Sequence, residues 1–177
     1  MTETSTAVPY QIKHRWQDRV VYQATEATTA ADALLEAVAA KADLCRADLS
    51  NVVMSYGARL DGASLVGASL GGDFIAATSD IAFAGPVGNC RRIVYAFRAK
   101  AEKGMVTVFR CGCFIGSAAD YLARVEQRYG PGGDNSACPE DARRRWLAEC
   151  KAALVACQAM AKTWPKVKVK AGKAVAK

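Results

Sequence analysis

The side chains best suited to nucleophilic chemistry are the cysteines, because the sequence holds seven of them beside a single histidine. A cysteine-dependent hydrolase or transferase needs a thiolate next to a base, and His14 is the sole imidazole that could serve. His14 falls in a predicted hairpin, where an edge or surface position is the ordinary interpretation. Cys113 is the better nucleophile candidate, since it precedes a predicted helix whose dipole favours a thiolate. Structural packing of Cys113 is the simpler interpretation, so the sequence assigns no catalytic residue.

Metal and cofactor chemistry find little support in the sequence. Cys111 and Cys113 form the one close cysteine pair, and they lack a second pair at zinc-finger spacing. We therefore predict no metal site, and a redox role for these two thiols is left open. No P-loop, GxGxxG, HExxH or GxSxG motif occurs, which predicts a protein without cofactor or enzymatic activity. The odd number of cysteines, without an export signal, favours reduced thiols.

Arginines supply the candidate residues for binding a partner. Arg91 and Arg92 stand together at the start of a predicted strand, and Arg110 is expected to neighbour them across a strand pair. Arg143, Arg144 and Arg145 form a second cluster, which a solvated helix face also explains. These six arginines are the predicted partner-binding set.

The net charge of +7 is unevenly placed along the chain. Residues 162–177 carry six lysines and no acid, which leaves a charge of only +1 on residues 1–161. Residues 165–177 are therefore predicted to be a disordered tail, which either solubilises the protein or adds salt-sensitive affinity for nucleic acid. No stretch approaches the roughly 20 apolar residues of a membrane helix. The start has no signal-peptide pattern, so we expect a cytoplasmic protein that does not bind membranes.

The elements that must position these residues follow from periodicity and capping signals. Alternating apolar residues predict a hairpin at 10–24, a Thr29–Asp32 cap opens a helix that ends near Lys41, and two strands are predicted at 92–98 and 105–111. Gly112 to Gly116 is expected to be a tight connection. Helices are then predicted from Ser117 to Tyr129 and from Pro139 to Pro165. Two tryptophans on the last helix favour self-association of the protein as a homodimer.

A five-residue period runs between these elements. Leu or Met recurs every five positions with a small residue two places earlier, and one extra residue interrupts the series near Tyr56. Neither a helix nor a strand keeps such residues on one face, whereas a coil with four sides of five residues does. The predicted core residues are Leu44, Leu49, Met54, Leu60, Leu65 and Leu70.

These quintets resemble the pentapeptide-repeat family, whose A(D/N)LxG units fold as a right-handed quadrilateral β-helix. The resemblance implies a mixed α+β protein in which residues 42–84 form a short solenoid. Residues 1–41 then supply a hairpin-and-helix cap, and residues 85–164 supply an α/β cap with a C-terminal helix. The wider arrangement, over roughly residues 10–155, resembles bacteriophage and prophage pentapeptide-repeat proteins of unassigned function.

That resemblance implies a protein-interaction module that binds and inhibits a host protein or nucleoprotein complex, such as one of anti-phage defence. DNA mimicry, which related proteins use against topoisomerases, fits poorly because residues 1–161 are nearly neutral. Two alternatives remain from the residues themselves. One is a nucleic-acid-binding accessory protein that uses the basic tail, and the other is the cysteine-dependent enzyme.

Overall fold

A computed structural model describes residues 8–50, 52, 60, 63–71, 73–101 and 104–166. Within them lie three helices and seven strands in two sheets. The strands are β1 (Gln11–Lys13), β2 (Val20–Gln23), β3 (Ser69–Gly71), β4 (Phe74–Val87), β5 (Arg92–Ala101), β6 (Gly104–Cys111) and β7 (Phe114–Gly116). The helices are α1 (Ala30–Ala39), α2 (Ala118–Tyr129) and α3 (Glu140–Lys162).

The larger sheet is antiparallel throughout and has the order β3-β4-β5-β6-β7. Successive side chains of β5 point to opposite faces, as the pleat of a strand requires. Tyr95 and Phe97 join one core, and Val94 and Ala96 join another. The sheet therefore separates two hydrophobic cores, and it forms the middle layer of the molecule.

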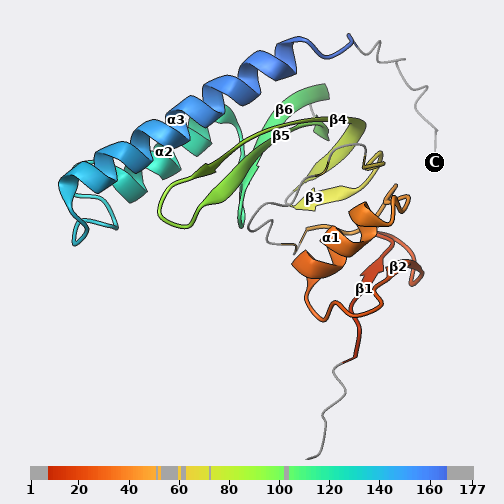
Figure 1. Cartoon of the computed structure of the whole chain (residues 1–177). Helices are drawn as coiled ribbons and strands as arrows, with labels where there is room; N and C mark the ends of the chain where they lie inside the picture. Colours follow the sequence, from red (N-terminus) through yellow and green to blue (C-terminus); the bar gives the residue numbers. More distant parts are fainter. Residues whose placement is uncertain are drawn as a thin grey trace, which may run out of the picture.

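Helices α2 and α3 cover one face of the sheet (Figure 1). Helix α2 begins with a capping box, in which Ser117 and Asp120 bond each other's backbone N–H groups. Its buried residues Tyr121, Val125 and Tyr129 recur every fourth position and so form one apolar stripe. Helix α3 runs alongside α2 and buries a similar stripe, which includes Cys150, Leu154 and Cys157.

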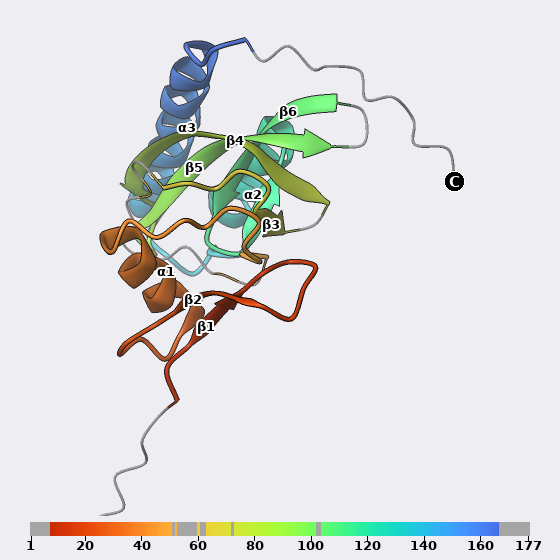
Figure 2. The ribbon, with the colours of Figure 1, turned by 90° about the vertical axis from the view of Figure 1, so that its right-hand side faces the viewer.

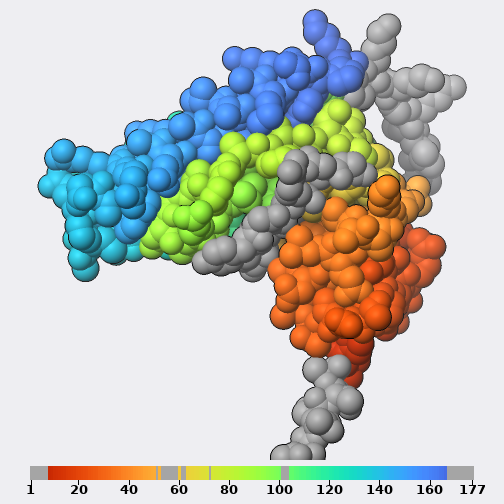
Figure 3. Space-filling view, in the orientation of Figure 1, coloured from red at the N-terminus to blue at the C-terminus, as the bar shows by residue number. Residues whose placement is uncertain are grey.

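The N-terminal lobe, here defined as β1, β2 and α1, packs with the quintet residues against the opposite face of the sheet (Figure 2). In the space-filling view it is the orange mass beside the sheet (Figure 3). Thr29 caps α1 by accepting a hydrogen bond from the backbone N–H of Asp32. The carboxylate of Glu36, on α1, accepts a hydrogen bond from the Thr25 N–H at 2.5 Å and so ties the helix to the chain that leads into it.

The prediction of a right-handed quadrilateral β-helix was wrong. Helices combine with an antiparallel sheet instead, and the quintets end in β3, which pairs with β4. The described quintet residues form turns with two isolated parallel bridges, Asp43 to Ser64 and Asp48 to Ser69. The physical reason is that the quintets are too few to stack on themselves, so their apolar side chains are covered by the larger sheet.

The leucine period nevertheless marks buried positions. Exposure is 0% for the five quintet leucines within the described residues: Leu44, Leu49, Leu60, Leu65 and Leu70. Met54 lies outside the described residues. The five-residue period thus predicts which side chains are buried. It does not predict which part of the protein packs against them.

Long strand β4 crosses position 84, where the sequence suggests that a solenoid ends and a cap begins. It joins the quintets to β5 in one continuous sheet. No helix in the described part of the chain is both long and apolar enough to cross a membrane. Of the expected tail, only Pro165 and Lys166 lie within the described residues.

Candidate anion-binding pocket

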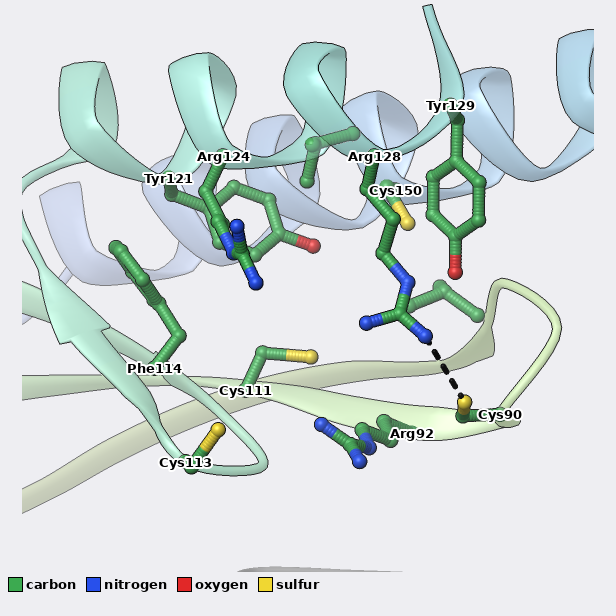
Figure 4. Close-up of a pocket in the computed structure, with 12 residues that line it drawn as sticks. Cys90, Arg92, Cys111, Cys113, Phe114, Tyr121, Arg124, Arg128, Tyr129 and Cys150 are labelled. Atoms are coloured by element: carbon green, nitrogen blue, oxygen red, sulfur yellow. Dashed lines mark hydrogen bonds between the residues drawn. The ribbon is translucent and has the colours of Figure 1, made fainter. Parts of the chain in front are cut away.

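A half-open pocket lies between α2 and the helix-facing side of the sheet (Figure 4). Its volume is about 80 Å³, where a single water needs roughly 10–15 Å³ by the same measure, so a group the size of phosphate fits. Twelve residues line it: Val87, Cys90, Arg92, Cys111, Cys113, Phe114, Tyr121, Arg124, Val125, Arg128, Tyr129 and Cys150. Three of these are arginines, and among the described lining residues none is acidic.

Two of the arginines come from α2 and one from β5. Arg124 and Arg128 are four residues apart, so they project from the same side of the helix, next to its buried stripe. Arg92 lies at the start of β5 and lines the pocket at the sheet, where its side chain points toward the turn that carries Cys113 (Figure 4). The fold therefore brings three guanidinium groups to one cavity from two elements that are distant in sequence.

Many of the N–H donors of these three arginines have no strong hydrogen-bond acceptor among the described residues. Arg92 has no hydrogen bond or ion pair with any described residue. Arg128 donates to the Cys90 sulfur at 3.5 Å, a weak acceptor, and its guanidinium lies 5.7 Å from the centre of the Tyr129 ring. Its Nε is buried without a hydrogen-bond partner among the described groups. Arg124 bonds Gln127 at 2.9 Å and lies 3.7 Å from the carboxylate of Asp134 in an exposed pair. Positive charge in the pocket is thus only partly neutralised.

The thiols around the pocket are poor nucleophiles where they are buried. Burial raises the pKa of Cys111 to about 12, although the charges of Arg92 and Arg128 act in the opposite direction. Burial also raises the pKa of Cys150 and of Tyr121. These groups stay neutral at physiological pH, so they add no negative charge to the pocket.

Cys113 is exposed in the turn before β7, but the base that an enzyme would need is elsewhere. His14 is 6% exposed within the N-terminal lobe, and its Nδ1 accepts a hydrogen bond from the Trp16 N–H at 3.2 Å. Burial and the nearby charges of Arg19, Arg46 and Arg15 lower the pKa of His14. Within the described chain, no group of three or more His, Cys, Asp or Glu residues is arranged to hold a metal ion.

Arg110, predicted to bind a partner, is instead an internal cation. It is 2% exposed, and its guanidinium donates to the carbonyl oxygens of Leu49 at 3.0 Å, Leu70 at 2.5 Å and Val52. Burial lowers the pKa of Arg110 to about 10. The alternation of β6 explains this position, because Arg110 pairs with Tyr95 and both face the quintets. Assignment of Arg110 to a partner surface was therefore wrong.

The remaining predicted arginines lie apart from the pocket. Arg91 and Arg145 line a separate groove with Trp146 and Glu149, and Arg92 is not part of its lining. Arg143 supports the loop before α3 by donating to the carbonyl oxygens of Gly130 and Cys138. Arg144 is exposed and paired with Glu140 on α3. Only Arg92 of the predicted set reaches the pocket.

Arg124 and Arg128 were missed by the sequence analysis, although a signal for them existed. Their spacing of four on a predicted helix marks one helical face, and Arg92 stands on a predicted strand that such a helix would cover.

No protein-family model matches this chain, and searches of curated proteins and of solved structures find no match.

Proposed function

We propose that the protein is a non-catalytic binding module whose pocket between α2 and the sheet captures an anionic group of phosphate type. The observation that carries the proposal is the convergence of Arg92, Arg124 and Arg128 on a cavity with no acidic residue among its described lining. A guanidinium presents a rigid fork of donors that matches the oxygens of phosphate. Two or three such groups around one cavity are the usual recognition device for a phosphate ester.

Partial burial strengthens this attraction. Charges in a cavity of low dielectric interact more strongly than charges in open water. Phe114, Tyr121 and Val125 supply apolar walls beside the arginines. An anion that enters would also supply a partner for the buried Nε of Arg128. Each of these features favours the binding of an anion in the pocket.

Binding is better supported than catalysis. The buried thiols of Cys111 and Cys150 are held protonated, and the imidazole of His14 is engaged inside its own hairpin. A phosphoryl-transfer enzyme of the cysteine type requires a thiolate and a proton donor around the arginines. Cys113 is an exposed thiol of the pocket, but no histidine is among the described lining residues to take its proton, so the reactive half of such a site is incomplete there.

The inhibition of a host protein or nucleoprotein complex by a phage-type module remains a proposal. A phosphate-binding pocket is consistent with it, because nucleoprotein complexes and phosphorylated ligands both present that group. Under this proposal, the partner carries an accessible phosphate ester or a similar anion.

Titration with pyrophosphate tests the proposed function. Calorimetry and ¹H–¹⁵N spectra of the full chain would show saturable binding, with shifts at residues of α2 and at the start of β5. We expect Arg92→Ala and Arg128→Ala each to weaken binding at least tenfold. Arg92→Lys should retain part of the affinity, because it keeps the charge and loses the fork.

Arg144→Ala is the matched control, since Arg144 is an exposed arginine on the adjacent helix outside the pocket. It should bind pyrophosphate as the wild type does. Absence of saturable binding, or equal loss in Arg144→Ala and Arg92→Ala, would overturn the proposal.

A further inference from the structure

The turn between β1 and β2 carries an aromatic side chain that the fold does not cover. Trp16 is 69% exposed, although indole is the largest apolar group that a protein can bury. The guanidinium carbon of Arg15 lies 3.5 Å from the centre of the Trp16 ring, on one of its faces. The arginine covers one face of the indole, the His14 ring lies tilted at 59° with its centre 6.1 Å away, and most of the remaining indole surface is open to solvent.

Two further arginines adjoin the turn through the backbone: the N–H of Arg15 donates to the carbonyl of Arg46 at 2.9 Å, and the carbonyl of Arg19 accepts from the N–H of His14 at 2.8 Å. Arg15, Arg19 and Arg46 all lie close enough to His14 to lower the pKa of that imidazole, after burial as the larger cause. None of the three has an ion pair with a carboxylate of the described residues. Two nitrogen atoms of Arg15, Nε and Nη1, are also buried without a hydrogen-bond partner there.

The acidic residues of this region are already engaged. Asp18 is 2.8 Å from the ammonium group of Lys13, with which it forms an ion pair. Asp43 and Asp48, on either side of Arg46, accept hydrogen bonds from Cys45 and Ser50 within their own turns. The three carboxylates keep their negative charge, and Arg19 and Arg46 are arginines of this region that have no ion pair with a described carboxylate.

A groove extends this surface toward the larger sheet. It is lined by Arg15 at one end, by Val66 and Met105, and by Lys100 on β5. Its volume of about 340 Å³ is ample for one unit of an extended chain. The surface therefore combines a free aromatic face, three arginines and a groove that carries a further cation.

We propose that the turn between β1 and β2, with Trp16 and Arg15, Arg19 and Arg46, binds single-stranded nucleic acid. A base stacks on the open face of Trp16, and flanking phosphates are held by the arginines. Alternation of aromatic platforms with cations is the general solution for binding a single strand without reading its sequence. This site is separate from the proposed pocket at Arg92, and it does not require the lysine-rich tail.

A single strand fits this surface better than an acidic peptide does. Carboxylates would satisfy the arginines, but they would leave the open face of Trp16 without a planar partner. A base supplies that partner, and each base stacked on an aromatic side chain contributes about 1–3 kcal/mol. Duplex DNA hides its bases from such a platform, so it should bind more weakly than a single strand.

Fluorescence anisotropy with a labelled 20-nucleotide oligothymidylate tests the site in the full chain. Trp16→Ala should weaken binding by about 5- to 150-fold, the change that corresponds to the loss of one stacked base. Trp16→Phe should recover most of the affinity. Arg19→Ala combined with Arg46→Ala should lower the slope of log K against log salt by about 1.4, or 0.7 for each lost phosphate contact.

Controls separate this site from the other basic regions of the protein. Arg144→Ala should bind the oligonucleotide as the wild type does, and circular dichroism should show that Trp16→Ala is folded. Wild-type affinity in Trp16→Ala would assign the binding to the tail and overturn the proposal. Loss of affinity in Arg92→Ala alone would assign it to the pocket. Tighter binding of poly-glutamate than of oligothymidylate, with the same dependence on Trp16, would favour an acidic protein as the partner.

Discussion

Gly112 lies directly against the guanidinium of Arg92. A Cβ at position 112 would stand 2.8 Å from the Arg92 Cζ, and Gly112 has a φ of +61°. The close approach lets the β6–β7 turn pack against the arginine side chain. A small residue in the turn thus helps to set the direction of a charged side chain in the pocket.

Gly112→Ala should weaken the binding of pyrophosphate about as much as Arg92→Ala does. The added methyl group must displace the Arg92 side chain, since no real Cβ approaches another atom so closely. Gly132→Ala is the matched control, because Gly132 has a similar φ of +70° and nothing within 4 Å of its would-be Cβ. Both variants carry the strain of a left-handed alanine. Equal affinities in the two variants would show that contact with Arg92 does not matter.

Arg110→Ala should destabilise the protein by about 2–6 kcal/mol, because the carbonyl oxygens of Val52 and Leu70 lose this donor at about 1–3 kcal/mol for each buried acceptor. The Leu49 carbonyl loses Arg110 but keeps the N–H of Val52 as a donor. Urea unfolding followed by circular dichroism measures the change. The exposed Arg144→Ala should stay within about 0.5 kcal/mol of the wild type. A wild-type midpoint for Arg110→Ala would contradict the role of the buried cation.

Stability should fall in acid through Glu36. Hydrogen bonds from the backbone N–H groups of Thr25, Ala27 and Glu26 lower the pKa of Glu36 to about 2, from an ordinary value of 4.5. Because the folded-state pKa is the lower one, the stabilisation is complete above pH 4.5 and is lost as the pH falls toward 2. Glu36→Gln should be less stable at neutral pH and should lose less stability over that interval. Parallel profiles for both proteins in thermal melts from pH 7 to pH 2 would rule this out.

Alkylation by iodoacetamide at pH 8 should distinguish the two cysteines of the β6–β7 turn. Cys113 is exposed and should react within minutes, whereas burial holds the pKa of Cys111 at about 12 and keeps its thiol protonated. Cys157, which is 0% exposed, provides an internal standard for a protected thiol. Mass spectrometry of tryptic peptides reports each site. Modification of Cys111 as fast as Cys113 would show that the pocket opens freely.

Local signals in the sequence located most of the elements. These signals depend on neighbours within a few residues: the alternation around Ile12 and Val21, the Thr29 cap and the Ser117–Asp120 cap. Each of the elements that they predict lies where it was expected. Strand β4 was missed because Phe74–Val87 contains many small residues and several irregularities in pairing, which obscure a period of two. Its existence depends on β5, to which it pairs.

The candidate pocket could be predicted only in part for the same reason. Arg92 was selected because it stands beside another arginine, yet Arg91 and Arg92 point to different sites. The register of a strand decides which of two adjacent residues faces the helices, and that register depends on the pairing of the whole sheet. Arg110 shows the same limit, since the pairing of β5 with β6 turns it inward. Charge alone gave no hint of that direction.

The buried guanidinium of Arg110 also constrains the order in which the chain can mature during synthesis. Leu70 and Leu49 precede Arg110 by 40 and 61 residues. Their carbonyl groups receive this donor only after β6 has left the ribosome and paired with β5. The quintet segment therefore stays only partly folded until β6 has been synthesised, and its apolar side chains are exposed to solvent during that time. Arg110 thus makes completion of the N-terminal half depend on the arrival of the C-terminal half.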